Sequence, residues 1–147
     1  MIAGVVNFTQ VDATVACAGD TPKEAIAAIA EQGFASVVNF RRDGEPGVAG
    51  EEDAVTAAGL RYYHLPMDPN APDFETVDRF LALVADPANQ PVYVHCASAN
   101  RVGGVWAIKR VVQDGWTRDA AIAEGQAIGL RSPVILEFVH RYLDARA

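Results

Sequence analysis

Residues 95–101 (His-Cys-Ala-Ser-Ala-Asn-Arg) combine a cysteine, small residues and an arginine in one short stretch. The stretch follows the apolar run at residues 91–94 and precedes a helical pattern from 102 to 112. A strand, a short loop and a helix N-terminus together direct backbone N–H groups and the positive end of the helix dipole at one point. We therefore expect this loop to bind an oxyanion.

Cys96 and Arg101 are the loop side chains suited to act on such a ligand. A free thiol has a pKa of about 8.5, so only about 3% of it is thiolate at pH 7. A helix N-terminus and a nearby arginine can lower that pKa to about 3.5–7.5, which favours the nucleophilic thiolate. The planar arginine fork binds phosphate or sulfate oxygens in pairs. The alternative is a buried core cysteine beside a surface arginine.

The composition is that of a globular domain with an acidic surface. The chain has 147 residues, 50% of them hydrophobic, and a net charge of -7 with a pI of about 4.8. Such a charge disfavours binding to nucleic acid or an anionic membrane. The two cysteines, Cys17 and Cys96, are too few for a disulfide framework. The sequence shows neither a signal segment nor a long apolar run. We therefore expect a cytoplasmic protein, in which thiols stay reduced.

Short apolar strands and helical patterns alternate along the chain. Strands are expected at residues 36–40, 60–65 and 91–95, with a further one at 15–18. This alternation predicts a single α/β domain over residues 1–147, with a mainly parallel central sheet flanked by helices.

Helix boundaries are marked by capping residues. A capping box at Thr21 predicts a helix to about residue 32, and Asp73 is the expected N-cap of a helix to about residue 85. A short helix is expected at 51–58. The last three helices are expected to begin at Arg101, Thr117 and Ser132.

Three of the predicted strands end in polar segments that parallel pairing would bring to one edge of the sheet. These segments deliver Arg41, Asp68 and Cys96. Asp68 is a candidate general acid for a leaving group, or an aspartate that starts a proline-containing turn. Asp73 is a weaker candidate, because helix capping already explains it. Arg41 either lines the pocket as a second positive charge or lies solvated in its loop.

Other polar residues near the loop have supporting or structural interpretations. Side chains alternate along a strand, so His95 should point away from the Cys96 side and hold the loop from beneath. Ser98 and Asn100 could stiffen the loop, bond to the thiolate, or simply form the turn. Cys17 could resolve an oxidised Cys96 if their strands are neighbours, although core packing explains it better.

The chain resembles the cysteine-dependent protein tyrosine phosphatases of the dual-specificity-like branch. It is most similar to the bacterial phosphatase-like domain related to beta-lactamase hydrolase-like proteins. The specific part is the His95-Cys96 pair with Arg101; the segments around residues 37–41 and 62–68 add to it. The resemblance implies Cys96 as nucleophile, Arg101 as phosphate-binding residue and Asp68 as general acid. It also implies phosphoryl binding by the backbone amides of Ala97, Ser98, Ala99, Asn100 and Arg101, with no metal or organic cofactor.

Two features depart from the phosphatase pattern. Four residues separate Cys96 from Arg101, where the phosphatase signature has five, and Val102 stands where those enzymes usually carry Ser or Thr. A four-residue spacer is a pattern of rhodanese-type sulfurtransferases, whose smaller loop surrounds a cysteine persulfide.

Three functions follow from these observations. The first is hydrolysis of phosphomonoesters of the phosphotyrosine or phosphoserine type through a cysteinyl-phosphate. The second is sulfur transfer through a Cys96 persulfide, and the third is a non-catalytic module that binds oxyanions or phosphoproteins. The expected partner is thus a phosphorylated substrate or a small oxyanion, while the physiological substrate and the oligomeric state are left open.

Overall fold

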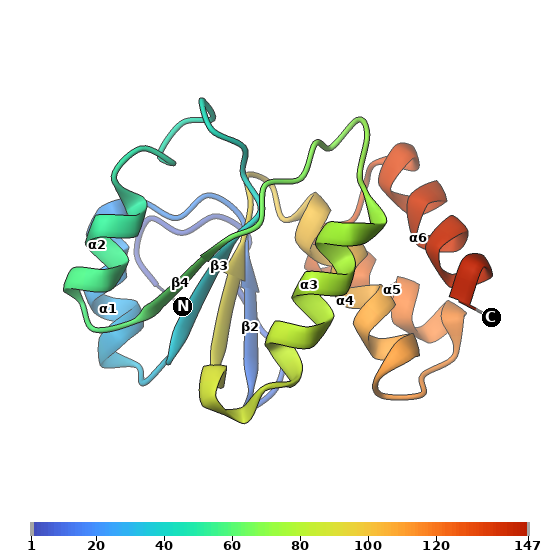
Figure 1. Ribbon diagram of the computed structural model, residues 1–147, viewed down its shortest axis with the longest axis horizontal. Coiled ribbons are helices and arrows are strands. Elements are labelled where there is room, and N and C mark those ends of the chain that lie inside the picture. The colour runs from blue at the N-terminus through green and yellow to red at the C-terminus, as the bar shows by residue number, and fades with distance from the viewer. Residues whose placement is uncertain (1, 147) are drawn as a thin grey trace.

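A five-stranded sheet forms the centre of the protein, and helices cover both of its faces (Figure 1). The structure is a computed structural model that describes residues 2–146. The strands lie in the order β1-β2-β5-β3-β4, and every neighbouring pair is parallel except β1 with β2. The predicted α/β class with a mainly parallel sheet is therefore confirmed. The strand bounds are β1 Thr9–Gln10, β2 Val15–Ala18, β3 Ser36–Asn39, β4 Arg61–His64 and β5 Val92–His95.

The helices divide into two groups by the face of the sheet that they cover. Helices α1 and α2 lie on one side, and α3 to α6 lie on the other (Figure 1). No helix among residues 2–146 combines the length and apolar character needed to cross a membrane. The bounds are η1 Lys23–Ala25, α1 Ile26–Glu31, α2 Glu51–Ala57, α3 Phe74–Ala85, η2 Pro87–Asn89, α4 Asn100–Val112, α5 Arg118–Ile128 and α6 Pro133–Arg146.

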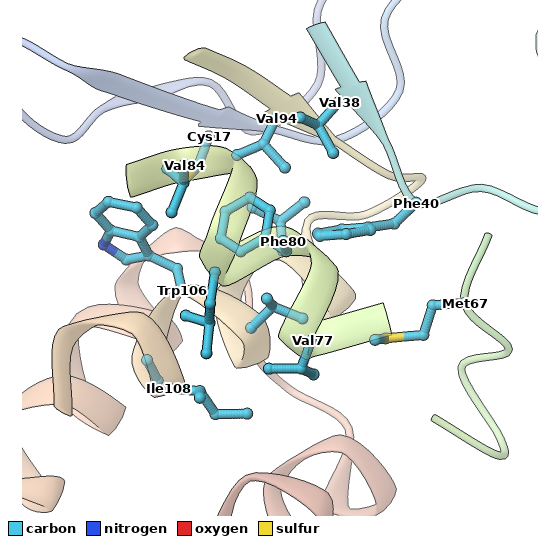
Figure 2. Packing of buried hydrophobic residues seen from close by; sticks show 14 of the residues in the cluster. Cys17, Val38, Phe40, Met67, Val77, Phe80, Val84, Val94, Trp106 and Ile108 are labelled. Carbon is cyan, nitrogen blue, oxygen red and sulfur yellow. The ribbon is translucent and has the colours of Figure 1, made fainter. Parts of the chain in front are cut away.

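The alternation of side chains along the strands creates a hydrophobic core on each face of the sheet. On the α3–α6 side, Cys17 and Val94 point from the sheet toward Phe80 of α3 (Figure 2). Tyr93 of β5 faces the opposite way and packs with α1 and α2 residues. Cys96 continues the Val94 face, while His95 follows Tyr93 to the other side.

Helix α4 is the central helix of the larger group, and its glycines allow close approach by its neighbours. A Cβ atom on Gly103 would lie 2.5 Å from the carbonyl oxygen of Gly125 in α5. A Cβ atom on Gly104 would collide with Ile135 of α6. These contacts fix the start of α4 against the helices behind it, and the start of α4 carries the loop that ends in Arg101.

Most predicted elements are present, but the prediction of a capping box at Thr21 is wrong. Thr21 caps no helix; its hydroxyl bonds to the carbonyl of Gly19 (3.0 Å) and to the hydroxyl of Tyr93 (2.8 Å). The helix begins instead as the 3₁₀ turn η1, whose N-cap is Pro22. Thr21 is buried against the sheet, where a tertiary hydrogen bond replaces the local one. The two-residue β1 was not predicted.

Candidate active site

Cys96 occupies the first position after β5, at the edge of the sheet where the parallel strands end. Its side chain is fully buried. The chain then turns through Ala99, which adopts a left-handed conformation (φ 71°) and is the N-cap of α4. Arg101 is consequently the second residue of α4 and lies in its first turn. The short spacer therefore places the arginine on the helix itself.

Consecutive backbone amides of this loop are not used in hydrogen bonds within the part of the protein that the structure describes. Among residues 2–146, the N–H groups of Ala97, Ser98 and Ala99 have no protein acceptor. The carbonyls point elsewhere, because Asp20 N–H donates to Ala97 O (2.6 Å) and the Asn7 amide donates to Ser98 O (3.0 Å). Consecutive amides free of protein partners at a helix N-terminus form an anion-binding concavity.

Arg101 is held in a fixed orientation by acceptors from two loops, the one after β3 and the one after β4. Its Nη1 and Nη2 each donate to one oxygen of Glu45, both at 2.8 Å. Nη1 also donates to Met67 O (3.0 Å) and Phe40 O (3.4 Å), the backbone that follows β4 and β3. Among the described residues, Nε–H has no protein oxygen as acceptor. The guanidinium therefore keeps donors available for a ligand in the loop.

The electrostatics of this cluster favour charged partners. Burial lowers the pKa of Arg101, but hydrogen bonds with Glu45 and with the Cys96 thiol outweigh it, so this pKa lies above its ordinary value. The hydrogen bonds from Arg101 are the largest cause of a lowered pKa at Glu45. The Cys96 thiol is thus among the groups that stabilise the charged guanidinium of Arg101.

A buried polar network lies under the loop, on the opposite side of the sheet from Cys96. His95 Nε2 donates to Glu51 Oε2 (2.9 Å), and both side chains are fully buried. Arg41 Nη2 donates to the other oxygen of Glu51 at 2.8 Å. The expectation that His95 points away from the Cys96 side and lies beneath the loop agrees with this geometry.

Arg41 belongs to this network and not to the loop cavity. Its guanidinium is 2% exposed and donates to Asp20, Glu51 and the carbonyls of Pro46 and Gly47. The expected substrate-binding position for Arg41 is therefore corrected: no donor of this side chain faces the loop. Its place two residues after Asn39, whose Oδ1 accepts from Arg41 N–H (2.9 Å), directs it beneath the sheet edge.

Asp68 lies at the rim of the site, and Asp73 has a structural role. Met67, the residue before Asp68, contacts Arg101 through its carbonyl. The Asp68 carboxylate is 35% exposed, accepts from Asn70 N–H (2.9 Å) and pairs with Arg42 (3.2 Å). The Asp73 carboxylate caps α3 by accepting from Thr76 N–H (3.0 Å). Of the two candidates, Asp68 directly follows a residue that contacts Arg101, whereas Asp73 caps a helix.

Cys17 and Cys96 lie in neighbouring elements of the same core. Strands β2 and β5 are adjacent, and Cys17 is level with Val94, two residues before Cys96. Burial raises the pKa of the Cys17 thiol well above its ordinary value. Cys17 is thus a poor nucleophile in the folded state. No three His, Cys, Asp or Glu side chains among residues 2–146 are grouped to hold a metal ion.

Sequence reasoning missed Glu45 and Glu51. Glu45 lies in the polar loop after β3, where charged residues are normally solvated. Glu51 is the first residue of α2, a position where the helix dipole already explains an acidic residue. The one signal in the sequence was that parallel strands bring several loops to the edge of the sheet that holds Arg101. One of those loops could therefore supply a carboxylate partner.

Comparison with known sequences identifies the family of this domain. The family model for the beta-lactamase hydrolase-like protein, phosphatase-like domain, matches residues 7–113. A beta-lactamase hydrolase-like protein of Xylella fastidiosa is 28% identical over 127 residues, which cover 84% of this chain and 29% of that protein. One from Agrobacterium fabrum is 34% identical over 77 residues, 50% of this chain and 18% of that protein. The chain thus spans about a third or less of these relatives.

Solved structures of phosphatases share the fold. A DUF442 phosphatase from Shewanella putrefaciens superposes with a TM-score of 0.84 at 19% identity, covering 97% of this chain and 94% of the other. The catalytic domain of the PP-IP phosphatase Siw14 from S. cerevisiae gives 0.81 at 19% identity, with coverages of 97% and 88%. TpbA from P. aeruginosa gives 0.73 at 23% identity, with coverages of 95% and 84%. Because the family model matches residues 7–113, a range that includes the Cys96–Arg101 loop, the chain belongs to the family of phosphatase-like domains found in beta-lactamase hydrolase-like proteins.

Proposed function

We propose that this domain hydrolyses phosphate monoesters, of the phosphotyrosine or phosphoserine type, through a cysteinyl-phosphate on Cys96. The observation that carries the proposal is the loop of free amides between a buried cysteine and an arginine held by Glu45. A phosphoryl group has three non-bridging oxygens, which match the amides of Ala97, Ser98 and Ala99 and the free edge of Arg101. Family membership supports the same chemistry.

In the first step, Cys96 Sγ attacks phosphorus. The S–P bond forms while the ester P–O bond breaks, and the bonding pair stays on the leaving oxygen. Asp68 donates a proton to that oxygen, a contribution typically worth about 10²–10⁴ in rate. Arg101 and the loop amides stabilise the negative charge of the transition state in a site shielded from water.

In the second step, water attacks the phosphorus of the cysteinyl-phosphate. The S–P bond breaks, the thiolate returns to Cys96, and Asp68 accepts a proton from the water. Val102 is nearly fully buried in the core and offers no hydroxyl to this step. The second step therefore relies on Arg101 and the amides, and we expect it to limit the turnover rate.

The burial of Cys96 sets a condition on catalysis. The thiol has no exposed surface, so a substrate reaches Sγ only after neighbouring residues move. The loop after β3 is bound to Arg101 through Glu45, whose carboxylate is 24% exposed. Substrate binding and a shift of this loop are thus expected to be linked.

The deciding experiment is hydrolysis of p-nitrophenyl phosphate from pH 5 to 8 by the wild-type domain and by the Cys96→Ser variant. We expect turnover in the wild type that is lost in Cys96→Ser. Rapid quenching with 32P-labelled aryl phosphate should trap label on the wild-type protein, because breakdown of the intermediate is slow.

Absence of turnover above that control would refute the proposal and direct attention to the two other functions. A persulfide on Cys96 after addition of thiosulfate, detected as a mass increase of one sulfur, would indicate sulfur transfer. Binding of orthophosphate that survives in Cys96→Ser, without either reaction, would indicate a binding module.

A further inference from the structure

A cavity lies against the flank of the Cys96–Arg101 loop. Its volume is about 180 Å³, room for several water molecules or one phosphoryl group. Its polar lining residues are Asn7, Ser98, Asn100 and Arg131. The remaining wall is the end of α5 and the turn that follows it. Among the described residues that line this cavity, none is a carboxylate.

Arg131 supplies the positive charge of this cavity. It is exposed, and its Nη1 donates to the carbonyls of Gln126 and Leu130. Within residues 2–146, Nη2 and Nε have no protein acceptor and no ion pair is formed. Arg61 is the other arginine without an ion pair among residues 2–146, and it does not line this cavity. The free edge of Arg131 retains the geometry that binds phosphate in pairs of hydrogen bonds.

Hydrogen bonds tie the cavity to the loop. Asn100 Oδ1 accepts from the backbone N–H of Arg131 (2.6 Å) and of Ser132 (2.8 Å). Asn100 directly precedes Arg101. The side chain of Asn100 therefore links the segment that carries Arg131 to the segment that carries Arg101. A Cβ atom on Gly129 would lie 2.7 Å from Ala99 Cβ, which shows how closely the α5–α6 turn packs on the loop. In Figure 1 this turn rises beside the start of α4.

We propose that this cavity is a second oxyanion subsite, centred on Arg131, that takes a second phosphoryl group of the same substrate. The inference rests on the proposed function, with the reacting phosphoryl bound at Cys96. Because Ser98 and Asn100 of the loop also line the cavity, the two phosphoryl groups would be neighbours. Substrates such as diphosphates or vicinal bisphosphates are then preferred to simple monoesters. Asn100 is a positioning residue in this scheme, because it fixes the backbone of Arg131 relative to Arg101.

The test compares two inhibitors that differ by one phosphonate group. Methylphosphonate occupies one site, and methylenediphosphonate, which resists hydrolysis, occupies both. Inhibition constants against p-nitrophenyl phosphate are measured for the wild type, Arg131→Gln and Arg141→Gln. Arg141 is an exposed arginine of α6 with a single long ion pair to Glu137 (3.8 Å), so its variant has the same change of charge away from the site.

We expect the wild type to bind the diphosphonate more tightly than the monophosphonate, and Arg131→Gln to lose about tenfold of that preference, because a charge-assisted pair of hydrogen bonds is lost. Arg141→Gln should keep the preference, and Arg131→Lys should keep part of it. Thermal unfolding of each variant checks that the fold is intact. An equal preference in wild type, Arg131→Gln and Arg141→Gln would overturn the subsite.

The same inhibitors separate this inference from the proposed function. Calorimetric titration of Cys96→Ser with both phosphonates needs no turnover. If the wild type is inactive but this titration loses its diphosphonate preference in Cys96→Ser/Arg131→Gln, the hydrolytic function fails and the subsite stands. If turnover is normal and the preference does not depend on Arg131, the subsite alone fails.

Discussion

Replacing Glu45 with glutamine tests whether the orientation of Arg101 controls activity. The Glu45 carboxylate accepts one hydrogen bond from Nη1 and one from Nη2 of Arg101, each at 2.8 Å. Arg101 is 5% exposed and Glu45 is 24% exposed, so solvent screens this pair only in part. Glutamine keeps the size of the side chain and one acceptor oxygen, but it loses the second acceptor and the charge.

The expected loss follows from these contacts. Hydrogen bonds to charged groups contribute about 1.5–3 kcal/mol each, and Glu45→Gln removes one of the two. A cost of about 2 kcal/mol in the oriented state of Arg101 corresponds to a decrease of about 30-fold in kcat/KM. The bonds from Arg101 to the carbonyls of Met67 and Phe40 remain, which keeps the decrease below that of removing Arg101 itself.

The assay measures kcat and KM for p-nitrophenyl phosphate, with Glu52→Gln as the matched control. Glu52 is an exposed carboxylate of α2, near in sequence to Glu45, and it makes no ion pair among residues 2–146. Glu52→Gln removes one negative charge, as Glu45→Gln does. Thermal unfolding of both variants separates loss of stability from loss of activity.

Two outcomes would refute the reasoning. If Glu45→Gln stays within about twofold of Glu52→Gln, the carboxylate does not orient the arginine. If Glu45→Gln is more active than the wild type, the carboxylate competes with the phosphoryl group for the guanidinium and acts as an internal inhibitor.

Three further predictions concern the acid, the helix contact and pH. Asp68→Asn should lower kcat/KM for phenyl phosphate by about 10²-fold, much more than for p-nitrophenyl phosphate, whose leaving group needs little protonation. The comparison uses kcat/KM because this quantity reports the first step, in which the ester bond breaks. Steady-state assays of both esters, with Asp73→Asn as control, test this, and equal losses for both esters would argue against an acid role. Gly103→Ala should reduce the free energy of unfolding by about 2 kcal/mol, measured in urea, because its Cβ would lie 2.5 Å from Gly125 O and this clash exceeds the gain in helix propensity. The free energy of unfolding should fall as pH drops below about 4.5, the ordinary pKa of a glutamate. The reason is that the pKa of Glu45 is lowered in the folded protein, so the unfolded chain binds the proton first. Urea unfolding at pH 3 to 6 should show a shallower fall of this free energy in Glu45→Gln, and an identical dependence on pH in both proteins would contradict this contribution.

Local sequence signals were sufficient for most elements of the fold. The caps at Asp73 and Thr117 are used as predicted, with side chains that accept from backbone N–H groups three residues on. Alternation along β5 placed Cys96 and His95 on opposite faces. Parallel pairing brought three loops to one edge. These features depend on the alternation of side chains along a strand and on hydrogen bonds between residues close in sequence.

Local signals failed where a polar residue had two possible partners. Thr21 carries the residue type of a cap, but its hydroxyl bonds across the sheet to Tyr93. Arg41 carries the charge of a substrate-binding residue, but its guanidinium is buried and pairs with Asp20 and Glu51. In both cases a partner distant in sequence offered a buried hydrogen bond, which is more favourable than the local or solvated alternative.

The sequence by itself therefore determined which residues can carry the chemistry: a cysteine and an arginine on a strand–loop–helix with an aspartate at the same edge. Only the tertiary structure decided how these residues are held. Glu45 meets Arg101 across 56 residues of chain, and Glu51 meets His95 across 44. Charge–charge contacts at such separations leave no periodic pattern in the sequence, because they form only after packing of the sheet and helices brings the loops together.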